Sequence, residues 1–159
     1  MIRGDHSYRL LAAAVSAAAI LAASTSLSVA QEGVIGAMTT VTDEMLKNPA
    51  DGDWLMARRT YNGWGYSPLD QINQDNVADL EIAWAWGMVP GRTQETPLAH
   101  DGVVFLQNSG HVVQALDGAT GDLIWEYSYD PPEGVSANGQ RTKVLYGDNL
   151  YIATRDAHL

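Results

Sequence analysis

Short apolar runs alternate with turn-forming residues between positions 95 and 127, which is typical of a small antiparallel sheet. The runs predict four strands, at residues 95–99, 103–107, 111–116 and 123–127. Asp101-Gly102 and Asn108-Ser109-Gly110 separate the first three runs, and both sequences favour tight hairpin turns. We therefore predict that the four strands pair in the order in which they follow one another.

The pattern upstream of this sheet is less regular. Acidic residues follow a capping threonine and a lysine precedes Asn-Pro, which predicts a short helix over residues 42–47. Residues 52–69 are rich in aromatic, glycine and turn-forming residues without a helical period, and predict an ordered loop whose aromatic side chains pack in the core. A capped turn at 75–80 comes next. Ile82, Trp84 and Trp86 then alternate with other residues, which predicts one face of a half-buried strand.

The turn before the last predicted strand contains the pattern Ala-x-Asp-x-x-Thr-Gly-x-x-x-Trp, at Ala115, Asp117, Thr120, Gly121 and Trp125. Asp117 can accept hydrogen bonds from backbone donors two residues on, and Gly121 can adopt a positive φ. Ala115 leaves room for a close neighbour, and Trp125 offers a large flat ring. Taken alone, this stretch also fits an ordinary β-hairpin.

The spacing of these five residues resembles the tryptophan-docking motif of the quinoprotein dehydrogenases. These enzymes are eight-bladed β-propellers that carry pyrroloquinoline quinone (PQQ), and in them the tryptophan lies between adjacent blades. The resemblance implies an all-β fold for this chain, the N-terminal part of an eight-bladed propeller that forms an incomplete ring. The motif is structural, so it does not by itself imply a bound quinone.

A second copy of the strand and turn pattern indicates a repeat. Residues 100–106 align with residues 146–152, an offset of 46 residues, and one propeller blade is about 40–50 residues long. The same offset places the next Ala-x-Asp beyond Leu159, so the second repeat is truncated. Because blades bury their faces only against neighbouring blades, we expect these residues alone to be poorly folded and inactive.

Other positions resemble the methanol and ethanol dehydrogenase branch of the family, namely Trp54, residues 66–69, 72–73 and 76–77, Leu80, and residues 83–84. The resemblance extends from about Thr42 to Leu159. It implies a PQQ- and calcium-dependent enzyme that oxidises a small alcohol to an aldehyde or ketone and passes the electrons to a cytochrome c. The alternative from another class is a non-catalytic β-propeller scaffold with PQQ-like repeats.

Two residues match positions at which the family contacts PQQ. Glu95, in the Gln-Glu step before the first predicted strand, resembles the glutamate that lies against the cofactor. Arg141, five residues ahead of Tyr146, resembles the arginine that contacts it, and a guanidinium is well suited to a carboxylate or a quinone oxygen. The alternatives are a surface acid at a strand edge for Glu95 and a solvated loop residue for Arg141.

The chain departs from the family at one functional loop. The methanol and ethanol enzymes usually carry two adjacent cysteines just before the arginine, whereas residues 134–139 lack cysteine here, as does the whole chain. This favours a cysteine-free branch, and any covalent haem, including one in a C-terminal domain, would need a Cys-x-x-Cys-His outside these residues. The catalytic base and the calcium ligands of the family fall beyond Leu159 and cannot be named.

No metal site is predicted within the chain. Asp51-Gly52-Asp53 lacks the spacing of a calcium loop and is interpreted as a turn. His100, His111 and His158 have no Cys, Asp or Glu at metal-ligand spacing, so we interpret them as ordinary strand-edge residues.

Residues 1–30 have the composition of a secretory signal, with Arg3 and Arg9 before an apolar run and Ser28-Val29-Ala30 before Gln31. The resulting division is a signal peptide at 1–30, a helix and aromatic loop segment at 31–79, and propeller repeats at 80–159. An uncleaved N-terminal anchor is the alternative. We expect a periplasmic protein without a stable membrane anchor, since the apolar run is too short for a comfortable span.

The net charge of the chain limits the classes of partner that it is expected to bind. The formal net charge is −10, and loss of residues 1–30 would change it to −11. Such an acidic chain is a poor match for nucleic acid, and it is compatible with a basic electron-accepting protein.

Overall fold

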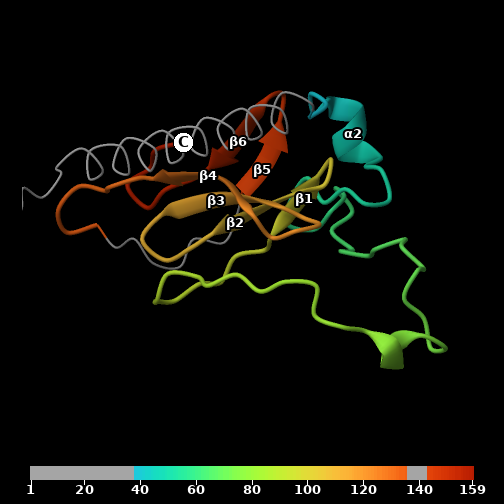
Figure 1. The fold of residues 1–159 in the computed structure, drawn as a ribbon. Helices are drawn as coiled ribbons and strands as arrows, with labels where there is room; N and C mark the ends of the chain where they lie inside the picture. The colour runs from blue at the N-terminus through green and yellow to red at the C-terminus, as the bar shows by residue number, and fades with distance from the viewer. Residues whose placement is uncertain (1–37, 136–142) are drawn as a thin grey trace, which may run out of the picture. The chain divides into compact units, whose positions relative to one another are not determined.

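The computed structural model describes residues 38–135 and 143–159 of the chain. It contains helix α2 (Asp43–Lys47), the 3₁₀ turn η1 (Val77–Asp79) and six strands in two sheets. The strands are β1 (Leu98–His100), β2 (Val103–Gln107), β3 (Val112–Asp117), β4 (Leu123–Ser128), β5 (Lys143–Tyr146) and β6 (Asn149–Ile152). Figure 1 shows their order along the chain. The predicted signal segment and the residue Arg141 lie outside the described residues.

Strands β1 to β4 form one antiparallel sheet in the order β1-β2-β3-β4, as predicted. Strand β2 has the predicted bounds, β3 is shifted by one residue at both ends, and β4 extends one residue further than predicted. The prediction for the first strand was wrong in extent, because pairing begins only at Leu98. Pro97 precedes that residue and has no N–H to donate to a neighbouring strand.

The turns of the sheet follow from their residues. Asp101 and Gly102 both have positive φ, 46° and 79°, as a two-residue hairpin of the primed type requires. After β3, Asp117 Oδ1 accepts hydrogen bonds from the backbone N–H of Ala119 at 2.8 Å and of Thr120 at 2.9 Å, and Gly121 has a φ of 78°. The predicted chemistry of this turn is therefore confirmed.

The second sheet is the hairpin of β5 and β6, and it repeats the first two strands of the larger sheet. Tyr146 pairs with Asn149 across its turn, as His100 pairs with Val103 in the first sheet. The offset between these equivalent pairs is 46 residues, which agrees with the repeat found in the sequence.

A short extended segment, Trp54 to Met56, lies between the first strands of the two sheets. Trp54 exchanges two backbone hydrogen bonds with Ala99 of β1, at 2.7 and 3.1 Å. On the other side, the N–H of Leu145 in β5 donates to the carbonyl of Leu55 at 3.0 Å, and Met56 bridges Val144. Leu55 has no exposed surface. The segment therefore joins the two sheets through backbone pairing; we call it the bridging segment.

The residues on either side of helix α2 support this junction. Val41 and Gly147 exchange hydrogen bonds at 3.0 and 2.8 Å, so the chain ahead of the helix pairs with the turn of the second sheet. Thr42 caps the helix by accepting from the N–H of Met45, as its sequence predicts. Beyond the helix, the buried guanidinium of Arg59 donates to the carbonyls of Pro49, Ala50 and Asp53 and fixes the turn ahead of Trp54.

His100, at the end of β1, fastens this N-terminal region to the larger sheet. Its side chain is 1% exposed, with Nε2 2.8 Å from the carbonyl oxygen of Thr39 and Nδ1 3.2 Å from Oδ1 of Asp53. Asp101 Oδ2 lies 3.5 Å from Nε2 and accepts hydrogen bonds from the N–H and the hydroxyl of Thr39. Because a carbonyl and carboxylates only accept, both ring nitrogens are placed to carry protons.

The predicted strand at residues 82–86 is not formed. Ile82 is 88% exposed, whereas the two tryptophans turn toward the larger sheet through their indole N–H groups. Trp84 Nε1 donates to the carbonyl of Gly118 at 3.0 Å, and Trp86 Nε1 donates to Gln114 Oε1 at 2.9 Å. The alternating sequence pattern thus correctly marked the two tryptophans that face the sheet. No described strand lies beside residues 82–86, however, so their backbone has no strand partner to pair with.

The aromatic loop is also less buried than predicted. Trp64 is 80% exposed, Tyr66 70% and Tyr61 67%, although Trp54 of the bridging segment is half-buried. Burial of such rings needs an opposing surface, and the described residues offer only one four-stranded sheet and one hairpin. The expectation that these aromatics form core is therefore wrong for the described part of the chain.

We predict that Gly121→Ala destabilises the protein by about 1–3 kcal/mol, because it adds strain at a positive φ and a clash. A Cβ at this position would lie 2.7 Å from Cδ2 of Trp84. Gly87→Ala is the matched control, since a Cβ there has no heavy atom within 4 Å. Chemical denaturation of both variants, made in the protein from the complete reading frame that contains this chain, measures the effects, and equal effects would contradict the close packing of Trp84 on Gly121.

We also predict that the contribution of His100 to the free energy of unfolding falls as the pH rises above about 6.5. Burial disfavours the charged ring of His100, but the acceptors Thr39, Asp53 and Asp101 outweigh it and raise the pKa of His100 above 6.5. The folded state therefore holds this proton to higher pH than the unfolded state, and the stabilisation is lost as the pH passes the raised pKa.

The slope from one such group is at most about 1.4 kcal/mol per pH unit. Other groups also titrate between pH 6 and 9, so the readout from denaturation curves is a difference: the free energy of unfolding of the wild type should fall with this slope relative to that of His100→Gln. His158→Gln serves as the control, because the His158 side chain is 67% exposed. The same slope in the wild type and in His100→Gln would refute the role of this imidazole.

Candidate functional site

The strongest candidate site is a buried ion pair where the two repeats meet. Glu95 lies three residues before β1, and Lys143 is the first residue of β5. The Lys143 ammonium contacts Oε2 of Glu95 and donates to the carbonyl of Thr96 at 2.7 Å. The side chains of Lys143 and Glu95 are 1% and 3% exposed. Glu95 is therefore not a surface acid, which removes one of the two interpretations of this residue.

Burial controls the electrostatics of the pair. Desolvation of the ammonium lowers the pKa of Lys143 to about 7. The contact with Oε2 of Glu95 acts in the other direction, because an adjacent carboxylate favours the charged form of the ammonium. A buried carboxylate or ammonium alone would be costly, so each charge depends on the other. The pair thus places one acid and one base, both removed from water, at the starts of equivalent strands.

The sequence analysis did not select Lys143. The repeat gives no signal for it, because the offset of 46 residues aligns Lys143 with Pro97, which is exposed. The burial of Lys143 follows from its contact with Glu95, a residue 48 positions earlier in the chain. Interior lysines are rare without a partner.

The other predicted site residue, Arg141, lies outside the described residues, as does the rest of the segment 136–142. In the repeat alignment it stands at the position equivalent to Glu95. It also precedes Lys143 by two residues, so its link to the site rests on the sequence.

One group of possible metal ligands occurs among the described residues: Asp53, His100 and Asp101, with ligand atoms within 4.8 Å of one another. In the sequence His100 has no acidic residue at metal-ligand spacing, but the turn before the bridging segment brings Asp53 to within 3.2 Å of its ring. The geometry nevertheless favours a hydrogen-bonded cluster. Nε2 faces a carbonyl and must carry a proton there, so it has no lone pair for a metal.

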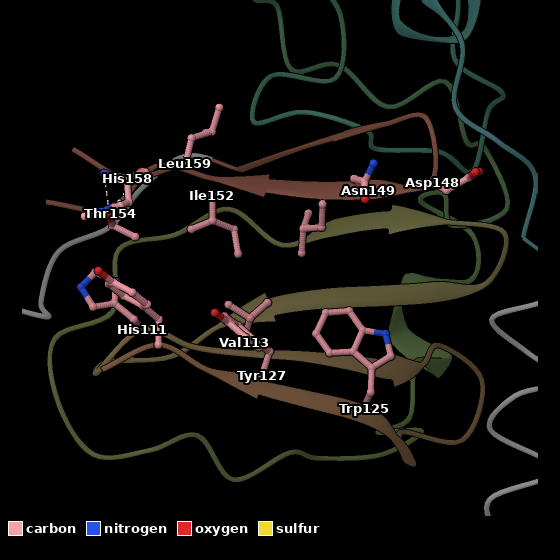
Figure 2. A pocket seen from close by; sticks show the side chains of 12 residues that line it. His111, Val113, Trp125, Tyr127, Asp148, Asn149, Ile152, Thr154, His158 and Leu159 are labelled. Atoms are coloured by element: carbon pink, nitrogen blue, oxygen red, sulfur yellow. Dashed lines mark hydrogen bonds between the residues drawn. The ribbon is translucent and has the colours of Figure 1, made fainter. Parts of the chain in front are cut away.

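A cavity of about 470 Å³ lies elsewhere, between the larger sheet and β6. Figure 2 shows Val113, Trp125 and Tyr127 on one side of it and Ile152 of β6 on the other. The buried ring of His111 also lines the cavity. Neither Glu95 nor Lys143 lines it, so the cavity and the ion pair are separate features. Docking of Trp125 against a further blade stays a prediction.

None of the helices in the described parts of the chain is long and apolar enough to cross a membrane.

Comparison with known proteins agrees with the repeated β structure. The family described as glucose/ethanol/alcohol dehydrogenase, β-propeller domain (PQQ) matches residues 54–155. The dehydrogenase subunit of the quinone alcohol dehydrogenase of Gluconacetobacter polyoxogenes is 34% identical over 95% of this chain and 21% of its own length. Quinohemoprotein alcohol dehydrogenase ADH IIB of Pseudomonas putida is 34% identical over 88% of this chain and 20% of its own.

A solved structure gives the same result. The crystal structure of quinohemoprotein alcohol dehydrogenase from Comamonas testosteroni superimposes with a TM-score of 0.62 and 28% identity, over 81% of this chain and 20% of that one. The chain thus spans about a fifth of the length of the relatives it matches. Since the family match covers both repeats and the bridging segment, the chain belongs to the family of β-propeller PQQ domains found in glucose, ethanol and alcohol dehydrogenases.

Proposed function

We propose that this chain is part of a PQQ-dependent alcohol dehydrogenase and that Glu95 and Arg141 hold the cofactor. The observation that carries the proposal is the burial of Glu95 against Lys143 at the start of the first repeat. A solvated acid at that position would have no evident role in a ligand site. A buried, charged carboxylate at a family cofactor position has a defined one.

The residues present fit a planar, tricarboxylated quinone in their chemistry. Such a ligand needs cationic donors for its carboxylates and polar groups at its ring edge. The starts of the two repeats supply a carboxylate, an ammonium and, at the position equivalent to Glu95, the guanidinium of Arg141. The burial of Glu95 and Lys143 also means that their electrostatic interactions are little screened by water.

Bound PQQ supplies an electrophilic quinone that takes up the electrons of the alcohol. The residues of this chain bind and orient that group and do not themselves exchange protons with the substrate. Arg141 is the donor for a carboxylate or ring oxygen, and its fixed charge and planar geometry suit either. Glu95 accepts hydrogen bonds at the edge of the ligand, and Lys143 compensates its charge.

The substrate, the metal ion and the electron acceptor in this proposal are inferred from the resemblance to the family. The substrate is a small alcohol, a calcium ion assists the quinone, and the electrons pass to a cytochrome c. The ligands of that ion and the catalytic base are proposed to lie after Leu159. Residues 1–30 are proposed to direct export to the periplasm, where the acidic surface would suit a basic electron acceptor.

We expect Glu95→Gln and Arg141→Gln each to weaken PQQ binding by roughly tenfold to hundredfold, the effect of losing one charge-assisted hydrogen bond. The protein should be expressed from the complete reading frame that contains this chain. Equilibrium dialysis with PQQ and Ca²⁺ gives the affinity, and alcohol-dependent dye reduction gives the activity.

Glu81→Gln and Arg92→Gln are the matched controls, because both residues are exposed. Activity that requires PQQ and falls only in the site variants supports the dehydrogenase. A folded wild-type protein that binds no PQQ and reduces no dye would overturn the proposal in favour of a propeller scaffold.

A further inference from the structure

We propose that Lys143 is a positioning residue of the cofactor site, which holds the Glu95 carboxylate charged and in the orientation that meets PQQ. This inference rests on the proposed function. It concerns a side chain that the sequence did not single out and that reaches the site from the other repeat.

The contacts of Lys143 fix both the charge and the place of the carboxylate. Its ammonium contacts Oε2 of Glu95 and donates to the carbonyl of Thr96, the next residue, at 2.7 Å. One group thus binds the side chain of Glu95 and the backbone beside it. Because the side chain and the neighbouring backbone are held by the same group, Glu95 has less freedom to turn away from a ligand.

The charge of Glu95 also depends on this contact. With 3% of its side chain exposed, Glu95 receives almost no solvation from water, and an isolated buried carboxylate takes up a proton instead. A protonated Glu95 would present one acceptor fewer to the cofactor. The ammonium beside Oε2 favours the charged form of Glu95, so both of its oxygens stay acceptors.

The strand itself does not require a lysine. Lys143 pairs with Ile152 through the backbone, and the equivalent position of the first repeat is occupied by Pro97. An unbranched apolar side chain could follow the path of the lysine stem and fill a similar volume. Lys143→Met therefore removes the charge with a small change of shape.

The two repeats contribute opposite charges to one contact. Glu95 belongs to the segment that leads into β1, whereas Lys143 belongs to β5. The bridging segment pairs with both strands, through Ala99 and Leu145. The relative position of the two charges is thus set by backbone hydrogen bonds, which suits a site that must be formed before its ligand arrives.

The test uses the protein from the complete reading frame and measures its PQQ affinity by equilibrium dialysis, with the absorption spectrum of the bound cofactor as a second readout. Lys143→Met should weaken binding about tenfold or more and shift the spectrum. Lys143→Arg, which keeps the cation, should restore both readouts to near the wild-type values. Lys47→Met is the matched control, since Lys47 is the exposed last residue of α2.

The double variant Glu95→Gln with Lys143→Met separates positioning from direct binding. If Lys143 acts through Glu95, the double variant should bind PQQ as well as Glu95→Gln alone does. It also removes both buried charges together, so it serves where the single lysine variant fails to fold. A further loss of affinity in the double variant would overturn the proposal, because Lys143 would then act on PQQ independently.

Unchanged affinity in folded Lys143→Met, beside weakened binding in Glu95→Gln, would refute the role of Lys143 and leave the proposed function intact. Circular dichroism and thermal unfolding report the folded fraction for each variant. A folded wild-type protein without PQQ affinity would overturn both proposals.

Discussion

Backbone pairing of residues 54–56 with two different strands is the constraint on which the rest of the described structure depends. A two-stranded hairpin such as β5–β6 has little stability by itself, and the larger sheet would expose the edge of β1. The bridging segment pairs with that edge and with β5 at once, and Leu55 is fully buried between them. The two repeats are therefore placed side by side by a segment that belongs to neither.

This junction explains why a buried ion pair can form at all. Glu95 and Lys143 are far apart in the sequence, and each begins its repeat. Holding opposite charges in contact away from water requires that neither strand can shift to release them. The cluster of His100, Asp53 and Asp101 adds a second polar contact between the larger sheet and the N-terminal region, so the arrangement near β1 is restrained from both sides.

Local chemistry was sufficient to predict the four-strand meander, the helix after Thr42 and the turn at Asp117. In these elements the determining contacts lie within a few residues, as in the hydrogen bonds from Ala119 and Thr120 to Asp117. The repeat could also be recognised in the amino-acid sequence, because its equivalent turns carry similar residues. Resemblance predicted Glu95 as a site residue, and this stays a prediction, although the side chain is buried against Lys143.

Contacts between distant segments were not predictable in this way. Nothing near Lys143 indicates that its ammonium meets Glu95, and nothing near Asp53 indicates that His100 will be its neighbour. The alternation at residues 82–86 was misleading for the same reason, since Trp84 and Trp86 are fixed by hydrogen bonds to Gly118 and Gln114 of the sheet and not by strand partners.

The pairing of Val41 with Gly147 has a consequence for how the chain reaches its folded state. A ribosome completes Val41 long before it adds Gly147, so this pairing cannot form until the turn of the second sheet has been made. Contacts of such long sequence separation form late and slowly, because a large loop has to close first. The segment ahead of helix α2, although made early, is thus among the last of the described residues to be fixed, and the edge of β5 is covered only when it pairs with residues that were made long before it.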